Sequence, residues 1–396
     1  MSTAKPKTLA KRIAFLSTLE GDAWGGSEFL WFEAARRALD RGHKVAAVTH
    51  ECEPYSEPVA RLAAAGVTCW VYPRARPSLA RRLAQGAIRR LWPKAGNPLP
   101  PVLRRVSAWR PDFVCLSQAS AYDGALRPGL FRFLRVSASS YGLICQHNTE
   151  QMQLLGEQDR TNVAAIYRGA HWVAFVAEGN RLKAERELGT LIPNGLIVKN
   201  PVNLTDRSPV PWPSPGPVQF ACVARLEASF KGQDLLFEAL AADRWKNRDW
   251  QLRLYGDGID RGYLERVARM YGLGGRIQFA GHVADVRGIW ADNHLLVLPS
   301  RSEGTPLSLV ESMLCGRPAV VTDVGGNAEW ITEPETGFIA EAPSTISIAR
   351  ALERAWEARD LWPVMGARAH EKTRTQVDQD PGGTLVDLIE RAVDCC

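Results

Sequence analysis

Short, β-rich apolar runs alternate with stretches of helical periodicity along the whole chain of 396 residues. This alternation is typical of parallel sheets whose strands are joined by crossover helices. The runs predicted as strands form two series: RIAFLS, KVAAVT, TCWVY, DFVCLS, GLICQ, WVAFVA and LIVKN, and then VQFACVA, QLRLYG, RIQFAG, LLVLPS, AVVTD and GFIA. The predicted fold class is therefore α/β, with two doubly wound parallel sheets.

A proline-rich segment separates the two series. Residues 200–217, NPVNLTDRSPVPWPSPGP, carry prolines at positions 201, 209, 211, 213, 215 and 217, which forbid a regular element. We predict a linker there, an N-terminal domain over residues 1–205 and a C-terminal domain over residues 218–380. Residues 381–396 are predicted to form a C-terminal helix that packs back on the N-terminal domain. Because open parallel sheets bind ligands at the carboxyl ends of their strands, we expect a site in the cleft between the domains.

The composition, 45% apolar and 23% charged, is typical of a soluble globular protein. The eight cysteines, at positions 52, 69, 115, 145, 222, 315, 395 and 396, form no CxxC pair and no Cys/His ligand spacing. We expect them to be reduced thiols of a cytoplasmic protein. The N-terminal apolar run Ile13–Leu16 is too short for a signal peptide, and no run approaches the roughly 18 apolar residues of a membrane span.

Positive charge is concentrated in one segment. Between Pro58 and Pro111 there are eleven basic residues and no acidic one, so this segment carries +11 and the rest of the chain +6 − 11 = −5. One interpretation is a helix in SLARRLAQGAIRRLW with a solvated outer face. The other is that residues 74–110 contact an anionic membrane surface, which would place the protein peripherally at the inner face of the membrane. Nucleic acid is not an expected partner, because nothing resembles a recognition module.

The stretch RSEGTPLSLVESMLCGRP places two glutamates around the start of a predicted helix that follows the strand LLVLPS. Thr305 is predicted as the N-cap, Pro306 as the first helical residue and Gly316 as the residue past the end. Glu303 would then lie where the strand opens into the cleft, and Glu311 on an edge of the helix. Two such carboxylates can accept hydrogen bonds from sugar hydroxyls, and free N–H groups at the helix start can bind an anion. The alternative is two solvated surface glutamates.

Two further strand-to-helix turns carry candidate residues. In VARLEASFKGQDLLFEAL, Arg225 and Lys231 flank the connection, and two cations at a strand end can stabilise a diphosphate leaving group. In WGGSEF, Gly25 and Gly26 permit close approach of the backbone to a ligand, and Ser27 is predicted to cap the following helix. Each pattern alone is also compatible with an ordinary solvent-exposed turn.

Together these motifs resemble the retaining nucleotide-sugar glycosyltransferases of family 4, which have the GT-B fold of two Rossmann-like domains. The resemblance rests on EGTPLSLVE, CGRPAVVTDVGGNAEWI, RLEASFKG, WGGSEF and LICQHNTE. It is strongest over residues 220–338 and weak over about residues 50–110. It implies that Glu303 binds the donor sugar and Glu311 the nucleotide ribose.

The resemblance also assigns the remaining candidate residues. Arg225 and Lys231 would hold the departing diphosphate, and His147 would lie beside the sugar, so that these three and Glu303 form the catalytic set. The donor-binding residues that it implies, besides Glu311, are Gly304, Thr305, Pro306, Leu307, Gly25, Gly26, His282 and Val283. The last two would lie against the nucleotide base.

The activity implied is transfer of a sugar from a UDP- or GDP-linked donor to a hydroxyl of a glycan or lipid-linked acceptor, with retention at the anomeric carbon and front-side attack. Such a reaction serves cell-surface polysaccharide or glycolipid synthesis. No cofactor and no metal are expected, because the acidic pair Asp378 and Asp380 falls in a C-terminal polar tail and the two cations can act in a metal's place. A GT-B epimerase and a catalytically silent sugar-nucleotide-binding protein remain as alternatives.

Overall fold

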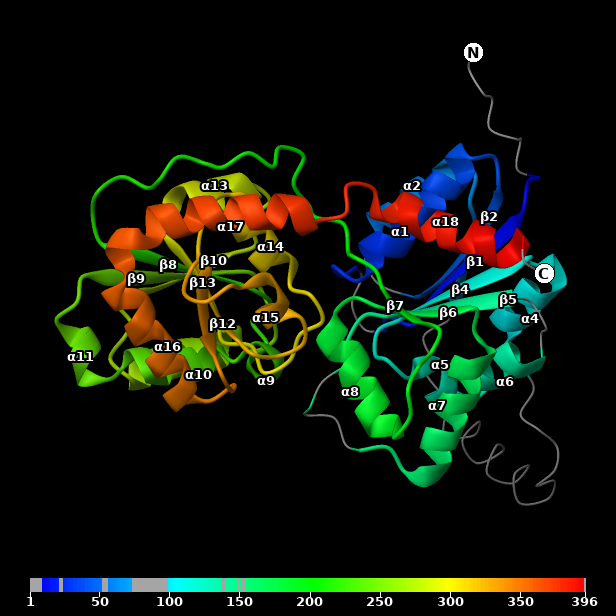
Figure 1. Cartoon of the computed structure of the whole chain (residues 1–396), viewed down its shortest axis with the longest axis horizontal. Helices are drawn as coiled ribbons and strands as arrows, with labels where there is room; N and C mark the ends of the chain where they lie inside the picture. The colour runs from blue at the N-terminus through cyan, green and yellow to red at the C-terminus, as the bar shows by residue number, and fades with distance from the viewer. Residues whose placement is uncertain are drawn as a thin grey trace, which may run out of the picture.

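The computed structural model describes residues 9–20, 24–51, 56–72, 99–136, 140–148, 150 and 154–394. Two α/β domains lie side by side, each built around a parallel sheet with helices on both faces (Figure 1). The two doubly wound sheets predicted from the sequence are therefore confirmed. Every predicted strand is present, and no strand end differs from its prediction by more than three residues.

The N-terminal sheet has seven strands in the order β3-β2-β1-β4-β5-β6-β7. Its strands are β1 (Arg12–Ser17), β2 (Lys44–His50), β3 (Thr68–Tyr72), β4 (Phe113–Gln118), β5 (Ser140–Cys145), β6 (Trp172–Phe175) and β7 (Gly195–Ile197). The helices are α1 (Glu28–Asp40), α2 (Glu57–Ala64), α4 (Pro101–Trp109), α5 (Asp123–Leu126), α6 (Pro128–Val136), α7 (Glu157–Gly169) and α8 (Glu178–Leu188).

The C-terminal sheet has six strands in the order β10-β9-β8-β11-β12-β13. Its strands are β8 (Val218–Val223), β9 (Trp250–Tyr255), β10 (Ile277–Gly281), β11 (Leu295–Leu298), β12 (Ala319–Thr322) and β13 (Gly337–Ala340). The helices of this domain are α9 (Ala228–Lys231), α10 (Gln233–Leu240), α11 (Asp243–Lys246), α12 (Arg261–Met270), α13 (Val286–Asp292), α14 (Leu307–Leu314), α15 (Asn327–Trp330), α16 (Thr345–Glu357) and α17 (Trp362–Gln376), with a 3₁₀ turn at Arg359–Leu361. They are followed by α18 (Pro381–Asp394).

Each sheet is buried on both faces. In β1, Ile13 and Phe15 belong to one hydrophobic cluster, while Ala14 and Leu16 belong to another on the opposite face. A strand between two helical layers needs apolar side chains in both directions, so it reads as an unbroken apolar run. This is why the strands could be recognised in the sequence.

The linker, residues 200–217, contains no helix or strand and runs along the C-terminal domain. The buried guanidinium of Arg317 holds it there by donating to the carbonyl oxygens of Val210, at 3.3 Å, and Pro211. The same guanidinium lies over the ring of Trp212, 4.7 Å from its centroid. Burial lowers the pKa of Arg317 to about 10.

After α17 the chain crosses from the C-terminal domain to the N-terminal domain, where α18 packs along α1 (Figure 1). Arg41, the residue that follows α1, lies 2.6 Å from a carboxylate oxygen of Asp387 and 2.8 Å from one of Glu390. The pair Asp378 and Asp380, predicted to lie in a polar tail, instead forms the turn between α17 and α18, where Asp380 accepts hydrogen bonds from Arg37 and from the backbone of Gly383.

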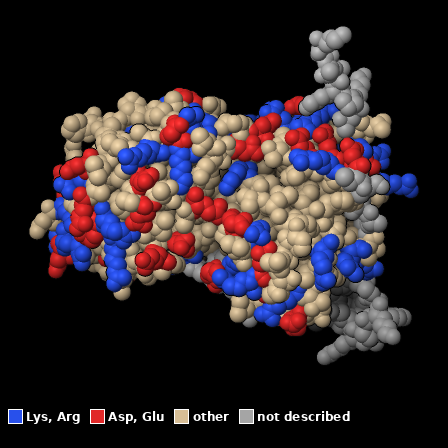
Figure 2. Space-filling view, in the orientation of Figure 1, with Lys and Arg blue, Asp and Glu red and all other residues tan. Residues whose placement is uncertain are grey.

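Much of the basic segment, residues 73–98, lies outside the described residues, so its predicted helix and its membrane contact are not described by the structure. On the face shown in Figure 2, basic and acidic side chains are interspersed over both domains. In the part of the chain that is described, no helix combines the length and apolar character needed to cross a bilayer. The described cysteines, Cys69, Cys115, Cys145, Cys222 and Cys315, are free thiols, and all except Cys69 are buried.

Candidate functional site

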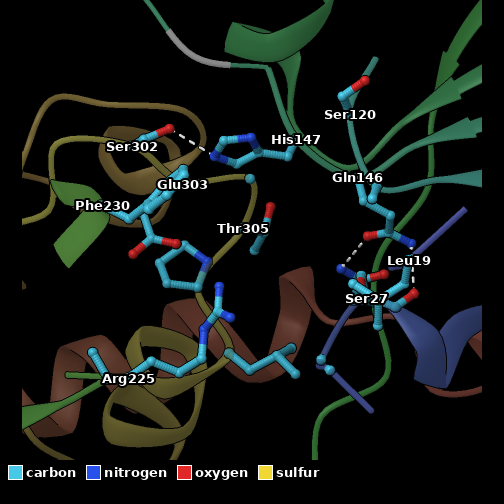
Figure 3. A pocket seen from close by; sticks show the side chains of 18 of the residues that line it. Leu19, Ser27, Ser120, Gln146, His147, Arg225, Phe230, Ser302, Glu303 and Thr305 are labelled. Atoms are coloured by element: carbon cyan, nitrogen blue, oxygen red, sulfur yellow. Dashed lines mark hydrogen bonds between the residues drawn. The ribbon is translucent and has the colours of Figure 1, made fainter. Parts of the chain in front are cut away.

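A cavity of about 770 Å³ lies between the two domains, at the carboxyl ends of the strands (Figure 3). The loops after β1, β4 and β5 line it from the N-terminal domain, and those after β8 and β11 from the C-terminal domain. Of the predicted site residues, it brings together Arg225, Lys231, Glu303, Gly304, Thr305, Pro306, Leu307, His147, Gly25 and Gly26. Three others, Glu311, His282 and Val283, do not line it.

Glu303 and Lys231 form an ion pair on the C-terminal wall. The Lys231 ammonium lies 2.7 Å from Oε1 of Glu303, and the hydroxyl of Ser300 donates to the same oxygen at 2.7 Å. Both side chains are largely buried, with 18% of Lys231 and 7% of Glu303 exposed. Because both hydrogen bonds reach Oε1, Oε2 is the carboxylate oxygen that retains capacity for a ligand hydroxyl.

Arg225 is the second cation of this wall. Its side chain is 56% exposed, and its guanidinium lies 3.5 Å from a carboxylate oxygen of Glu227. Its backbone carbonyl accepts a hydrogen bond from the side chain of Gln233, which anchors the turn after β8 to α10. The backbone of the turn is thus anchored by this hydrogen bond, while the exposed guanidinium of Arg225 lines the cavity.

His147 lies at the end of β5, in the N-terminal domain, and reaches the opposite wall. Its Nε2 is 2.6 Å from the hydroxyl of Ser302, and its ring centroid is 6.1 Å from that of Phe230 (Figure 3). Burial lowers the pKa of His147, with the nearby Lys231 acting in the same direction and Glu303 opposing it. His147 is therefore neutral at neutral pH, which suits a hydrogen-bonding role more than an ionic one.

The glycine-rich loop lies opposite, where Gly26 approaches Leu307 so closely that a Cβ would lie 3.2 Å from its Cδ1. Ser27 occupies the N-cap position of α1, but its predicted side-chain cap is wrong: its backbone is already helical (φ −65°, ψ −23°) and its hydroxyl makes no capping bond. The loop is held instead by Gln146, whose amide donates to the Ser27 carbonyl at 2.9 Å and accepts from Asn200 at 3.0 Å.

The predicted N-cap of α14 is also wrong. Pro306 occupies the cap position, and the helix begins at Leu307. The Thr305 hydroxyl is engaged elsewhere, since it donates to the carbonyl of Val176 in the N-terminal domain at 2.7 Å. Gly316 does terminate the helix as predicted, with φ +79°.

Glu311 was predicted on an edge of the helix, with solvated glutamates as the alternative, but it is buried, with 7% of its surface exposed. Its carboxylate accepts a hydrogen bond from the backbone N–H of Asn203, and burial raises its pKa to about 7. The backbone N–H of His282 donates to Asp257 at 3.0 Å, and Val283 packs against the hydrophobic core.

A polar group on the N-terminal wall was missed in the sequence. The Thr18 hydroxyl donates to Asp123 at 2.5 Å, and Arg127 donates to the Thr18 carbonyl at 2.9 Å. Arg127 also lies 3.5 Å from a carboxylate oxygen of Glu20, and the backbone N–H of Ser120 donates to Asp123. The position of these residues in the sequence could have identified them, because they follow β1 and β4, whose carboxyl ends open into the cleft.

Side chains that could bind a metal ion are scattered rather than grouped. Within the described ranges, no three His, Cys, Asp or Glu side chains lie together so that they could hold a metal ion. On the C-terminal wall, the groups that can neutralise an anion are the side chains of Arg225 and Lys231 and the backbone near the start of α14.

Comparison with known proteins gives matches in sequence over part of the chain. Residues 217–358 match the model of the family described as Glycosyl transferases group 1. A segment of 110 residues is 36% identical to the Vi polysaccharide biosynthesis protein VipC/TviE of Salmonella typhi, covering 28% of this chain and 19% of that protein. Another of 166 residues is 30% identical to the lipopolysaccharide core biosynthesis glycosyltransferase LpsE of Rhizobium meliloti, covering 42% of this chain and 47% of that protein. The matches thus span less than half of the length of these relatives.

Comparison of structures extends over both domains. The structure of Anabaena Alr3699/HepE in complex with UDP aligns with a TM-score of 0.71 at 17% identity, covering 97% of this chain and 100% of that one. The same protein has also been solved in complex with UDP-glucose. At this identity the likeness establishes the fold, and the family match confirms the resemblance predicted from the motifs. The chain therefore has the GT-B fold, and residues 217–358 of its C-terminal domain are similar to the group 1 glycosyltransferase family.

Proposed function

We propose that this protein is a retaining glycosyltransferase that moves a sugar from a nucleoside diphosphate sugar to an acceptor hydroxyl. The observation that carries the proposal is the C-terminal wall of the cavity, where Arg225, Lys231 and Glu303 face the glycine-rich loop. This wall combines cations for a diphosphate with a carboxylate for sugar hydroxyls. The UDP and UDP-glucose complexes of HepE, which shares the fold, support a nucleotide sugar as the donor.

The two cations would act on the leaving group. When the bond between the anomeric carbon and the diphosphate breaks, negative charge grows on the departing phosphate, and fixed cations stabilise that charge. An ammonium group has three donors, so Lys231 can keep its hydrogen bond to Glu303 while it binds a phosphate oxygen. Arg225, which is more exposed, can reach the same diphosphate from the turn after β8.

The proposed reaction exchanges one C–O bond for another on the same face of the sugar. The anomeric carbon loses its bond to the diphosphate oxygen and forms a bond to the acceptor oxygen, whose proton passes to the departing phosphate. Glu303 orients the sugar through Oε2, and neutral His147 borders it. No metal ion and no further cofactor take part in this scheme.

The N-terminal wall would bind the acceptor. Thr18, Asp123 and Arg127 offer both donors and acceptors of hydrogen bonds, which suits a hydroxyl-bearing group. The names of the relatives, a polysaccharide biosynthesis protein and a lipopolysaccharide core biosynthesis glycosyltransferase, support a glycan or lipid-linked acceptor. With a lipid-linked acceptor, the basic residues 74–110 would contact an anionic membrane surface and keep the protein at its inner face.

The test is turnover of a panel of UDP- and GDP-sugars, with slow donor hydrolysis as the readout and NMR of the product for anomeric configuration. Lys231→Ala should abolish turnover, whereas Lys246→Ala, which removes a surface cation paired with Asp243, should leave it unchanged. No turnover of any nucleotide sugar would favour a silent binding protein. Release of an epimerised nucleotide sugar would favour an epimerase, and an inverted product would refute retention.

A further inference from the structure

Beside the cavity, two loops from different domains meet in a contact surface that we call the glycine seam. On the N-terminal side the seam comprises residues 176–180, which follow β6 and include the start of α8. On the C-terminal side it comprises residues 325–329, which follow β12 and include most of α15, together with Gly304. The backbone N–H of Gly179 donates to the carboxylate of Glu329 at 2.9 Å across the domain boundary. None of residues 176–180 or 325–329 lines the cavity, so none of them is among the donor-binding residues described above.

Glycines make this contact possible. A Cβ on Gly179 would lie 2.5 Å from the carbonyl oxygen of Gly325, and one on Gly304 would lie 2.1 Å from the carbonyl oxygen of Gln146. Side chains do not occupy such distances, so any larger residue at either position must separate the two backbones. Both contacts join one domain to the other, and the seam therefore sets how closely the domains approach.

Asn180 links the seam to Glu303. It is buried, with 1% of its surface exposed, and its amide donates to the backbone carbonyl of Asn148 at 3.0 Å and to that of Glu303 at 3.4 Å. The amide of Asn148 in turn donates to the carbonyl of Asn180 at 3.4 Å. The N-terminal domain thus holds the backbone of the residue whose carboxylate accepts from Lys231 and Ser300.

The position of Gly179 separates an interdomain role from a role within its own helix. Gly179 is the second residue of α8, and its φ is not in the left-handed region, so alanine can adopt its backbone conformation. Alanine has the higher helix propensity. The local helix therefore does not require glycine at position 179. The close approach of the Gly325 carbonyl oxygen does require it, because a Cβ would lie too near that oxygen.

We propose that Gly179 and Asn180 are positioning residues: they set the spacing of the closed domains and so place Glu303 against the donor sugar. The inference rests on the proposed function for its catalytic consequence, but not for the contact itself. A displacement of Glu303 by about 1 Å is enough to lower the rate of an oriented reaction by about 100-fold. Nucleotide affinity should change little, because the side chains assigned to the diphosphate and the ribose, those of Arg225, Lys231 and Glu311, all belong to the C-terminal domain.

The test compares Gly179→Ala with Gly262→Ala. Gly262 is the second residue of α12, the same helical position, but its nearest neighbour is a guanidinium nitrogen of Arg266 at 3.7 Å. Hydrogen–deuterium exchange of the segments 176–188 and 303–307 reports the seam without any substrate. Gly179→Ala should speed exchange in both segments, lower kcat for donor hydrolysis by about 100-fold, and leave the melting temperature and the Kd for UDP unchanged. Gly262→Ala should match the wild type in all four measurements.

Asn180→Asp provides a second variant of nearly the same shape, in which the amide donor to Glu303 is lost. The same change removes the donor to the carbonyl of Asn148 and places a buried carboxylate against both oxygens, so kcat should fall by at least about 2- to 12-fold, the value of one neutral hydrogen bond. Asn194→Asp is its control, because that amide donates to the carbonyls of Tyr167 and Ala170 within one domain. If Gly179→Ala exchanges at the same rates as the wild type in both segments, the claim that Gly179 sets the spacing of the domains is wrong. Faster exchange with unchanged kcat would overturn the positioning of Glu303. If the wild-type protein shows no turnover, both the proposed function and the positioning role are refuted. The exchange experiment still tests the interdomain contact, because it needs no substrate.

Discussion

Replacing Glu303 by glutamine should separate sugar binding from nucleotide binding. Glutamine keeps the shape of the side chain, and its amide oxygen can still accept hydrogen bonds from Lys231 and Ser300, which now reach Oε1 at 2.7 Å each. The NH₂ group then stands where Oε2 stood and cannot accept a hydrogen bond from a sugar hydroxyl. The variant therefore removes one charged acceptor from the proposed sugar site.

A hydrogen bond to a charged group contributes about 1.5 to 3 kcal/mol, so kcat/KM for the donor should fall by about 10- to 150-fold. The Kd for free UDP should not rise, because UDP carries no sugar. It should hold or decrease, since Lys231 loses the negative charge that now neutralises it and can interact more strongly with phosphate. The opposite directions of the two effects make the variant informative.

Steady-state kinetics of donor hydrolysis and calorimetry with UDP measure the two quantities. The control is Glu353→Gln, which removes the charge of a carboxylate that accepts two hydrogen bonds from Arg248, at 2.7 and 2.8 Å, away from the cavity. It should change stability but not kcat/KM. If Glu303→Gln weakens UDP as much as it lowers kcat/KM, or leaves kcat/KM within threefold of the control, Glu303 does not bind the sugar.

Activity should survive EDTA, because Arg225 and Lys231 are assigned to the diphosphate; loss of turnover that Mn²⁺ or Mg²⁺ restores would show that assignment to be incomplete. Glu311→Ala should weaken UDP by about 10- to 150-fold if the carboxylate binds the ribose, and unchanged affinity would mean that it stays with the backbone N–H of Asn203. Burial raises the pKa of Glu28 from 4.5 to about 7, so the folded state keeps a proton that the unfolded chain releases, and stability falls as pH rises from 4.5 to about 7 and then levels. Glu28→Gln, which can still accept from Trp31, should remove up to about 3 kcal/mol of that fall in urea titrations across this pH window; an unchanged pH dependence would contradict the buried-acid account. Reversal of the arginines at 81, 82, 89 and 90 to glutamate should abolish sedimentation with anionic liposomes, and equal sedimentation of variant and wild type would favour a solvated helix face.

The two sheets could be predicted because their signal is local. A strand buried on both faces is a short apolar run, and the sequence contains these runs in the order of the two domains. Glu303, the two cations and the glycine-rich loop were also predicted from the sequence, because each lies in the connection that follows a strand. Shared position at the carboxyl ends of strands brings most of them to one cavity, although they are distant in sequence.

The failures concern partners that are far away in sequence. Thr305 has the residue type and position of an N-cap, but the carbonyl that its hydroxyl binds, in Val176, lies 129 residues away in the other domain. Helical periodicity placed Glu311 on a polar edge, but the linker residue Asn203 covers it. Periodicity describes one helix and carries no information about the segment that packs over it.

The glycines show the same limit most clearly. Gly142 in β5 and Gly179 in α8 both lie inside regular elements, where glycine is disfavoured, and each permits a close contact. A Cβ on Gly142 would lie 2.4 Å from the ring of Trp172 within one sheet, whereas Gly179 faces a carbonyl of the other domain. The two look alike in sequence, but replacing Gly142 should unfold the N-terminal domain and replacing Gly179 should leave it folded. A glycine inside a helix therefore does not by itself indicate a close contact, since no distant segment approaches Gly262, and only the structure identifies the loop after β12 as the segment that faces Gly179.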